Sequence, residues 1–531
     1  MDGGQIRERL DRAVASLAWG ARFKEARVYH LSNLTSDHSP LSLHFFLKQK
    51  KQFQQKIFRF ESMWLKDPKC EDIVKNTWEE GSMAVGSFLI LKCMELCRSR
   101  LEVWKKREFR HVGMKINELQ RRLGWLELQV ASPATISAMR ETQVELNCWY
   151  DRESAMWFQR SRVNWFQARD QNTRYFHARA SSRHKKNTII GLLDSNGIWQ
   201  EDEQKIEDIV TSHYRALFCS SGPMDFTELL ASIHPHVSIS MNQMLNKTFQ
   251  GSEVSALKQM YPLKSPGPDG MLPLFFQHFW PSIGHLVSKT VLDFVNFGIA
   301  PPMFNDTHVV LIPKNKDPKN ISDYRPISLC NVIFKLASKV IANRLKKVLP
   351  SIISDTQSAF VHGRLITDNV FVAFEVMHHI SQKKVGRKGE MALKLDMSKA
   401  YDRVAWVCLE KIMEKLGFDS RWRSLIMRCV TTVSYSFRIN GKISNSIQPS
   451  RGICQGDPLS SYLFLIVVEG LSALIKKSVE EGVLEGISVC RRGPKLSHLF
   501  LTDDSLIFCK ATLCDCDSLQ QIFQVYEKAS G

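Results

Sequence analysis

The sequence lacks any stretch that could cross a membrane or direct export. Its longest apolar run is YLFLIVV at 462–468, far shorter than the roughly 20 apolar residues that span a bilayer. The first residues, MDGGQIRERL, contain no apolar segment of the kind that signal peptides carry. We therefore expect a protein without a membrane partner, not secreted, and located in the nucleus or cytoplasm.

Regular cysteine spacing is also missing. The 13 Cys are scattered and odd in number, which argues against a disulfide framework and favours a reducing compartment with buried thiols. Cys509, Cys514 and Cys516 lie close together, but no His follows them at zinc-finger spacing. Ordinary packing of these three thiols is therefore favoured over a metal site.

Acidic residues are in the minority, and neither internal repeats nor long low-complexity segments occur. The chain has 72 Lys and Arg against 54 Asp and Glu, a formal net charge of +18. Such an excess favours a polyanionic partner, and nucleic acid is the first candidate. Because 44% of the 531 residues are hydrophobic, we expect two or three folded domains and not a disordered chain.

From about residue 46 to 186 the pattern is typical of helices. Basic and aromatic residues alternate most densely in RSRVNWFQARDQNTRYFHARASSRHKK at 160–186. Nucleic-acid grooves combine Lys and Arg for phosphates with aromatic faces for bases. The alternative is a solvated amphipathic helix whose aromatic residues face a core.

Beyond residue 187, predicted strands alternate with helices. TIIGLLDSNGIW at 188–199 predicts a hairpin, VVLIPK at 309–314 a buried strand, and ALKLDM at 392–397 another strand. Residues 328–349 predict a long amphipathic helix that stops at Pro350. A further helix is predicted over 398–416. Its predicted buried face is Val404, Leu409, Ile412, Met413 and Leu416. The chain is therefore expected to belong to the α+β class.

Three carboxylates stand in unusual surroundings. Asp396 ends an apolar strand, and Asp503 and Asp504 lie between two apolar runs in FLTDDSLIF at 500–508, which predicts a hairpin with the acidic pair at its tip. Buried carboxylates cost several kcal/mol unless a cation or hydrogen bonds compensate. Their hard oxygen atoms suit Mg²⁺ or Mn²⁺, although an Asp-Asp turn exposed to solvent is the simpler alternative.

Four further segments accompany these carboxylates. They are RGICQGDPLSSYLFLIV at 451–467, ISDYRPISLCNVIFKLASKV at 321–340, QSAFVHGRLITDN at 357–369 and SPGPDG at 265–270. The second segment places Arg325 just before a predicted helix start. In order and kind, residues 188–531 resemble the fingers and palm of reverse transcriptases, most closely those of LINE-type non-LTR retrotransposons in the form common in plants.

The resemblance implies a site built around metal ions. Asp396 and Asp503 are expected to bridge two ions, Mg²⁺ or Mn²⁺, and Asp504 to be a weaker or outer ligand. Tyr401 matches the aromatic residue that packs under the sugar and excludes a 2′-hydroxyl. A core aromatic residue is the alternative for Tyr401.

The resemblance also implies a pocket for the incoming nucleotide. Arg325 is expected to contact the triphosphate, with Lys314 assisting, and Gln455 and Gly456 to line the pocket. The implied partners are an RNA template, a DNA primer or target, and deoxynucleoside triphosphates; the oligomeric state is left open. Two further carboxylates, Asp402 and Asp457, are expected to be structural caps and not metal ligands.

The N-terminal residues resemble the end of the apurinic-endonuclease-like domain that precedes the polymerase in this family. ERLDRAVAS at 8–16 and SDHSPL at 36–41 carry the matching residues Asp11, Asp37 and His38. Most ligands of that metal cluster are missing, so we expect no endonuclease activity. The resemblance implies three parts: an endonuclease-domain remnant at 1–45, a helical basic linker at 46–187 that binds RNA, and fingers and palm at 188–531.

Several positions depart from the family pattern. Leu501-Thr502 replaces an aromatic-Ala pair, Cys454 stands where Arg is usual, and Ser461 and His362 stand where Pro is usual. In the family, the last palm strands and the thumb would follow residue 531. We therefore expect residues 1–531 alone to bind RNA and to extend primers barely. The alternatives are a decayed, catalytically inactive element that only binds nucleic acid, and a helical interaction protein, which leaves the ordered motifs unexplained.

Overall fold

The structure, a computed structural model, describes residues 14–16, 19, 23, 26–30, 41–44, 58–83, 88–109, 112–163, 173–220, 222, 225–383, 389–490, 493–502 and 504–530. The chain divides into two compact units. The first comprises residues 1–57, 61–70 and 99–183, and the second comprises residues 58–60, 71–98 and 184–531. Residues 71–98, which belong to the expected linker, thus have most of their contacts in the second unit.

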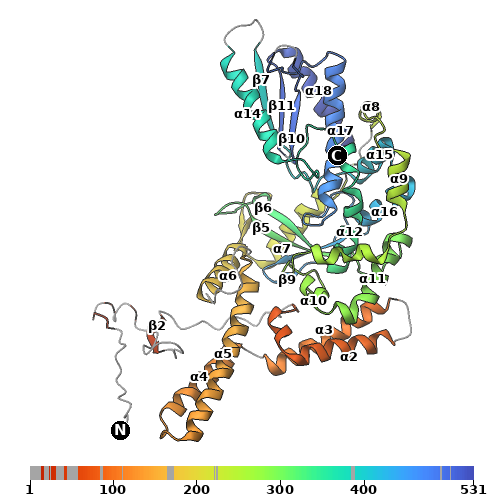
Figure 1. Cartoon of the computed structure of the whole chain (residues 1–531). Helices are drawn as coiled ribbons and strands as arrows, with labels where there is room; N and C mark the ends of the chain where they lie inside the picture. The colour runs from red at the N-terminus through yellow and green to blue at the C-terminus, as the bar shows by residue number, and fades with distance from the viewer. Residues whose placement is uncertain are drawn as a thin grey trace. The chain divides into compact units, whose positions relative to one another are not determined.

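The first unit is mostly helical. Its strands β1 (Arg27–His30) and β2 (Leu41–His44) pair antiparallel. Its other regular elements are η1 (Ser62–Lys66), α4 (Val112–Glu127) and α5 (Pro133–Ser161). The unit also includes parts of three helices whose remaining residues belong to the second unit, which are α2 (Pro68–Ser82), α3 (Leu89–Glu108) and α6 (Thr173–Asn187). Helices α4 and α5 lie side by side (Figure 1). The helical pattern predicted for 46–186 is confirmed in its described part.

Local sequence signals explain where α5 begins. Ser132 accepts a hydrogen bond from the amide of Thr135, and Pro133 occupies the first helical position. Aromatic rings then hold the unit together. Trp104 makes edge contacts with Trp64 and Phe109, at centroid distances of 5.9 and 4.9 Å.

The second unit mixes helices with three sheets. Its helices are α7 (Glu203–Leu217), α8 (Thr227–Ser232), α9 (Ile239–Asn246), η2 (Gly251–Gln259), α10 (Pro273–His278), α11 (Trp280–Phe297), η3 (Ile321–Asp323), α12 (Val332–Leu345), α13 (Leu349–Ile352), α14 (Ile366–Gln382), α15 (Trp406–Leu416), α16 (Ser420–Thr431), α17 (Ser460–Glu480) and α18 (Leu513–Ser530). None of the helices in the described part of the chain has the length and apolarity that crossing a membrane requires.

A four-stranded sheet has the order β6-β5-β8-β9. Strand β5 (Asp306–Pro313) pairs antiparallel with β6 (Tyr324–Cys330) and parallel with β8 (Ser434–Ile439), which pairs with β9 (Lys442–Ile443). Residues of β5 alternate between buried and half-buried, so one face meets a core that includes residues of α7. The short hairpin of β3 (Leu192–Leu193) and β4 (Trp199–Gln200) confirms the turn predicted at 188–199.

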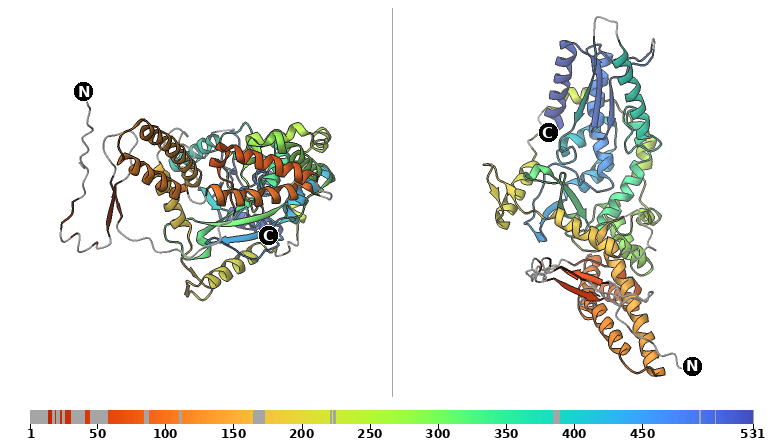
Figure 2. Two further views of the ribbon diagram at one scale, coloured as in Figure 1. Left: turned by 90° about the horizontal axis from the view of Figure 1, so that it is seen from below. Right: turned by 90° about the vertical axis from the view of Figure 1, so that its left-hand side faces the viewer.

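A three-stranded antiparallel sheet has the order β10-β11-β7. Its strands are β10 (His498–Leu501), β11 (Asp504–Lys510) and β7 (Glu390–Asp396). The two views of Figures 1 and 2 show α14 and α18 on opposite sides of these strands. Val376 of α14 packs in one buried cluster with Leu499 and Phe508.

Two predicted helices begin later than expected. Residues 328–330 belong to β6, because Ser328 pairs with Val309 and its amide donates to the carbonyl oxygen of Gln455. Helix α12 covers only Val332–Leu345 and is buried almost all round instead of amphipathic. Pro350 lies in the first turn of α13, which begins at Leu349, instead of ending α12. The helix predicted over 398–416 covers only Trp406–Leu416, although all five residues of its predicted buried face are buried.

Candidate active site

Two of the predicted carboxylates meet at one end of the three-stranded sheet. Asp396 is the last residue of β7 and Asp504 is the first residue of β11, and the two are Cα partners in the antiparallel pair. Partners of this kind point to the same face, with Cβ atoms about 4.5–5.5 Å apart. The fold thus brings together two acidic residues from distant parts of the sequence.

The predicted hairpin at 500–508 is confirmed. Leu501 of β10 pairs with Asp504 of β11, and Thr502 adopts a positive φ of 66°. Asp503, the other predicted bridging ligand, lies outside the described residues, as do Asp11, Asp37 and His38. Among the described residues, which therefore omit one of the three acidic positions, no group of three potential metal-ligating side chains is found.

The carboxylates are more open to solvent than the sequence predicted. Asp396 and Asp504 are both exposed, so the expected cost of burial does not arise. Lys394 lies two residues before Asp396 on the same face, and its Nζ is 3.1 Å from Oδ1 of Asp504. The ion pair shows that a cation is already favoured at this exposed end of the sheet, and the hard oxygen atoms there fit a divalent metal.

A turn held by the 451–453 segment follows Asp396. The amide of Ile453 donates to the carbonyl oxygen of Tyr401 at 2.9 Å, and the amide of Gly452 donates to that of Val404 at 2.8 Å. These bonds take backbone groups that a helix would have used, which explains why α15 begins only at Trp406. The half-buried ring of Tyr401 stacks on Phe464 of α17, with centroids 5.0 Å apart.

Gln455 and Gly456 form a turn against β6. The carbonyl oxygen of Gln455 accepts from the amide of Ser328 at 3.0 Å. Gly456 has a φ of 112°, which side chains rarely tolerate, and an added Cβ would lie 3.4 Å from the carbonyl oxygen of Ser328. The φ of Gly456 and the nearby carbonyl oxygen of Ser328 therefore explain why residue 456 is a glycine. The expected reason was different, namely close approach of the nucleotide.

The two predicted cationic residues lie at one end of the β5–β6 hairpin. Arg325 is an exposed residue of β6 opposite Ile312, so the prediction that it just precedes a helix is wrong; the strand hydrogen bonds of β6 separate it from α12. Lys314 follows β5 directly and donates its amide to the carbonyl oxygen of Asp323 at 2.8 Å. Their charged groups are both available at the surface.

Comparison with known proteins decides the family of this region. Residues 312–531 match the family model described as reverse transcriptase (RNA-dependent DNA polymerase). The chain contains a reverse transcriptase domain. The match includes all three acidic positions as well as Lys314, Arg325, Tyr401 and the Gln455 turn.

Two similar proteins come from transposable elements, and a third is an uncharacterized mitochondrial protein. An uncharacterized 149 kDa protein of transposon TX1 from Xenopus laevis is 27% identical over all of this chain and 40% of its own length. A Pol polyprotein from the type-1 retrotransposable element R2 of Popillia japonica is 26% identical over 40% of this chain and 28% of its own length. An uncharacterized mitochondrial protein of Arabidopsis thaliana is 46% identical over 13% of this chain and 57% of its own length. The chain thus spans less than two thirds of each of these relatives.

Two buried carboxylates of the reverse transcriptase domain differ from the exposed pair. Asp457 accepts hydrogen bonds from the hydroxyl of Ser338 at 2.5 Å and from the amide of Leu459 at 3.0 Å, which indicates a structural role, although no side chain caps α17 itself. Burial raises the pKa of Asp402 to about 6, against the opposing positive charges of Lys399 and Lys314. Both carboxylates are buried, whereas Asp396 is exposed.

Lys399 is a feature that the sequence analysis missed. It has a positive φ of 57° in the turn after Asp396, and its Nζ lies 5.7 Å from the ring centroid of Tyr214. In the described part of the chain this buried Nζ has no hydrogen-bond partner. The sequence predicted a helix over residues 398–416, and only the tertiary structure shows that Lys399 lies in a turn with its ammonium group buried.

The candidate zinc cysteines do not gather. Cys509 is buried in β11, whereas Cys514 and Cys516 of α18 are exposed. Burial raises the pKa of the Cys509 thiol to about 11, which suits a packed neutral thiol and not a metal-binding thiolate.

Proposed function

We propose that this chain is an RNA-directed DNA polymerase that transfers nucleotides onto a primer 3′-hydroxyl with the help of two divalent ions. The observation that carries the proposal is the register of β7 and β11, which sets Asp396 beside Asp504 at one exposed end of the sheet. Reverse transcriptases as a family use divalent metals and nucleic-acid substrates, which is consistent with the family match of residues 312–531. The particular template, primer and ions of this chain belong to the proposal.

The residues have distinct roles in this proposal. Asp396 and Asp503 would hold two Mg²⁺ or Mn²⁺ ions, with Asp504 as a weaker ligand. When bound, such ions activate the attacking hydroxyl and stabilise the leaving oxygen of an in-line displacement. Arg325 and Lys314 would bind and orient the triphosphate through charge-assisted hydrogen bonds.

Gln455 and Gly456 would line the nucleotide pocket, with the position of their turn fixed by its hydrogen bond to Ser328. A misplacement of about 1 Å at a reacting centre can cost on the order of 10²-fold in rate. A turn anchored to a strand therefore suits a positioning role.

The direct test is incorporation of thymidine nucleotide by the chain on an oligo(dT) primer annealed to poly(rA). Single-turnover conditions with excess protein would detect slow incorporation. We expect incorporation that requires Mg²⁺ or Mn²⁺ and an RNA template strand. A chain that binds this primer-template but incorporates nothing with either ion would support the alternative of a decayed element that only binds nucleic acid.

The proposed gate role of Tyr401 predicts an effect on sugar selection. Replacing Tyr401 with Ala removes the ring beneath the proposed sugar position, and discrimination against ribonucleotides should fall by about 1–3 kcal/mol, roughly 10–200-fold. The measurement is the ratio of ribonucleotide to deoxynucleotide incorporation efficiencies.

Tyr401→Phe is the matched control, because it keeps the ring and its stacking on Phe464. It should retain the wild-type ratio. If Tyr401→Ala lowers protein stability but leaves the ratio unchanged, Tyr401 is a core aromatic residue and not a gate.

We also propose that α6 contributes to RNA binding. Arg179 and Arg183 are exposed on this helix, together with the last-turn residues His184, Lys185 and Lys186. Its aromatic Phe176 is instead buried against Phe158 at 5.3 Å, so the aromatic part of the prediction fits the core alternative better. The proposed contact is therefore one of charge with phosphate, without base stacking.

A double variant tests this contact. The logarithm of RNA affinity falls linearly with the logarithm of the salt concentration, and each single-strand phosphate contact contributes about 0.7 to the slope. The double variant Arg179→Ala with Arg183→Ala should therefore make this slope shallower by about 1.4. Arg121→Ala with Arg122→Ala, an equally exposed pair on α4, should leave the slope unchanged. Equal changes for both pairs, measured by RNA-binding anisotropy over a salt series, would show that the charge of α6 has no particular role.

The finer organisation is proposed on the resemblance alone. We propose that residues 188–531 correspond to polymerase fingers and palm, residues 46–187 to a linker, and residues 1–45 to an inactive remnant of an endonuclease-like domain. A plant-type LINE element and a nuclear or cytoplasmic location belong to the same proposal.

A further inference from the structure

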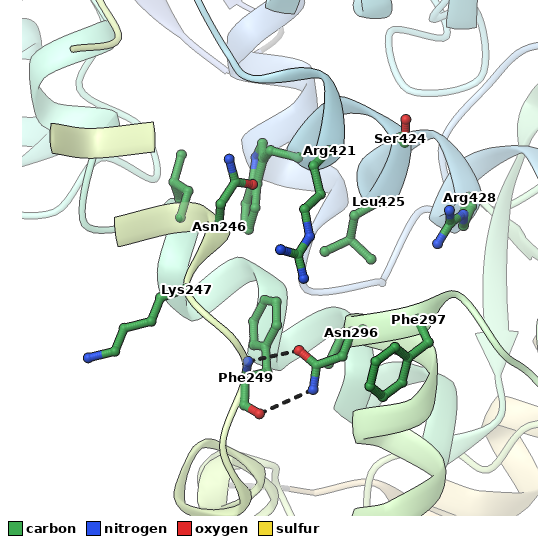
Figure 3. Close-up of a pocket in the computed structure, with 12 residues that line it drawn as sticks. Asn246, Lys247, Phe249, Asn296, Phe297, Arg421, Ser424, Leu425 and Arg428 are labelled. Carbon is green, nitrogen blue, oxygen red and sulfur yellow. Dashed lines mark hydrogen bonds between the residues drawn. The ribbon is translucent and has the colours of Figure 1, made fainter. Parts of the chain in front are cut away.

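The second unit contains a surface pocket that none of the candidate active-site residues lines. It has a volume of about 230 Å³. Its walls come from the end of α9 and the loop after it, the end of α11, and α16 (Figure 3). The lining residues are Leu245, Asn246, Lys247, Phe249, Val295, Asn296, Phe297, Arg421, Trp422, Ser424, Leu425 and Arg428.

The inner wall of the pocket is apolar and rigid. Phe249 and Trp422 are buried and lie nearly parallel, at an interplanar angle of 16° with centroids 6.5 Å apart. Phe249 also lies under the guanidinium of Arg344, whose Cζ is 3.4 Å from the centroid of the Phe249 ring. Because Phe249 and Trp422 are packed against their neighbours, they cannot move easily to fill the pocket, and the pocket is a stable part of the fold.

Hydrogen bonds fix the loop that forms one wall. Asn296 of α11 accepts from the amide of Phe249 at 2.8 Å and donates to its carbonyl oxygen at 3.2 Å, as Figure 3 shows. Arg344 donates to the carbonyl oxygens of Leu245 and Lys247. The amide of Asn296 is therefore occupied, and it shapes the pocket instead of contacting a ligand.

The rim of the pocket is cationic. Lys247, Arg421 and Arg428 are exposed, and within the part of the chain that the structure describes none of them forms an ion pair. Figure 3 shows Arg421 extending from α16 toward Phe249 and Asn296. No carboxylate is among the lining residues. An anionic group is therefore the ligand chemistry that this rim favours.

The three cations are not equivalent. An added Cβ on Gly298 would overlap the guanidinium of Arg428, so Arg428 packs closely against the end of α11, where a cation is favourable. Arg421 has no comparable structural role, and neither does the ring of Phe297, which is 68% exposed at the rim. These two side chains and the exposed Lys247 are free to meet a ligand.

We propose that this pocket binds one unpaired nucleotide of a nucleic-acid strand, with the base against Phe297 and the apolar wall and the phosphate on Arg421. Aromatic faces combined with cations are the usual means of holding single-stranded nucleic acid. Pockets for drug-sized ligands measure about 300–1,000 Å³, so this smaller space can enclose no more than the base of one nucleotide, with its phosphate outside at the rim. The inference uses the proposed nucleic-acid substrate, but it does not depend on the metal site.

The test is binding of a short fluorescein-labelled single-stranded RNA in the absence of divalent ions and free nucleotides. Stacking of one base contributes a factor of roughly 5- to 150-fold in affinity, so Phe297→Ala should weaken binding by a factor in this range. Phe371→Ala is the matched control, because Phe371 is also 68% exposed but lies on α14. It should leave the affinity unchanged.

A charge variant and a crosslink complete the experiment. Arg421→Ala should weaken binding more than Arg215→Ala, which removes an exposed arginine from α7. RNA that carries 5-iodouridine should crosslink on irradiation to the peptide that contains Phe297. Equal losses for each variant and its control would overturn the proposal, as would crosslinks that avoid this peptide. Neither result would affect the polymerase proposal, which is measured by incorporation.

Discussion

Asp396→Asn is expected to reduce single-turnover nucleotide incorporation by roughly 10³-fold or more, because metal coordination supplies several kcal/mol of transition-state stabilisation and each 1.36 kcal/mol is tenfold in rate. The carboxylate at the end of β7 is exposed, so the amide should fold normally. RNA affinity should change little, since the proposed phosphate contacts are made elsewhere. The loss should therefore lie in the incorporation rate and not in template binding.

The matched control is Asp317→Asn. Asp317 is an acidic residue of the same domain whose side chain is 84% exposed and whose ion-pair partner is Lys319 at 3.7 Å. This variant should incorporate nucleotide at the wild-type rate. If Asp396→Asn retained more than a tenth of the wild-type rate, Asp396 could not be a bridging metal ligand.

Arg344→Ala is expected to lower the free energy of unfolding by about 1.5–3 kcal/mol, the usual contribution of hydrogen bonds to charged groups, because the guanidinium is buried while Glu253 is partly exposed. Arg344 is 5% exposed and makes a forked contact with Glu253, with both N···O distances at 2.7 Å. It also donates to the carbonyl oxygens of Leu245 in α9 and of Lys247 and Thr248 after the helix. Its loss would leave both the carboxylate and these carbonyl groups without their partner.

The same pair predicts a pH dependence. Burial acts to raise the pKa of Glu253, but the hydrogen bonds and charge of Arg344 outweigh it and hold the pKa below its ordinary value. A depressed folded-state pKa contributes stability above the unfolded value near 4.5, and this contribution is lost as the pH falls through the folded pKa. Wild-type stability should therefore decline below about pH 4.5 more steeply than that of Arg344→Ala.

Denaturant unfolding over a pH series measures both effects. Lys347→Ala is the control, because Lys347 is exposed and adds positive charge near Glu253 without a hydrogen bond. It should cost less than about 1 kcal/mol, as exposed charges do. If the two variants were equally stable, general charge and not the forked contact would hold this region together.

The strands and helices that carry the reverse transcriptase motifs were predictable because their signals are local. Apolar alternation identified β7, and the apolar runs on either side of the acidic pair identified the β10–β11 hairpin. The apolar run after the Gln455 turn likewise identified α17. In each case the local preference agrees with the tertiary fold.

The errors occurred where distant segments supply the hydrogen bonds. The pairing of Ser328 with Val309 makes a strand of residues whose periodicity suggested a helix. The bonds from Gly452 and Ile453 hold residues 401–404 in a turn for the same reason. These hydrogen-bond partners are far away in the sequence, so a stretch as long as one helix does not contain them.

The candidate site was predictable in its residue types but not in its exposure. The sequence suggested buried carboxylates, whereas Asp396 and Asp504 are exposed at the end of the sheet, where Lys394 pairs with one of them. Exposure depends on what covers the sheet, which is a property of the whole fold. The pocket beside α16 was missed because its lining residues come from three separated segments, none of which forms a motif alone.

Binding of Mn²⁺, followed through the electron paramagnetic resonance signal of the free ion, tests most directly whether the two strands share a metal site. We predict that the wild-type chain binds Mn²⁺ and that Asp396→Asn and Asp503→Asn each remove most of this binding, because ligands of a shared site depend on one another. Asp317→Asn should bind as the wild type does. Undiminished Mn²⁺ binding by both Asp396→Asn and Asp503→Asn would contradict the proposed metal centre.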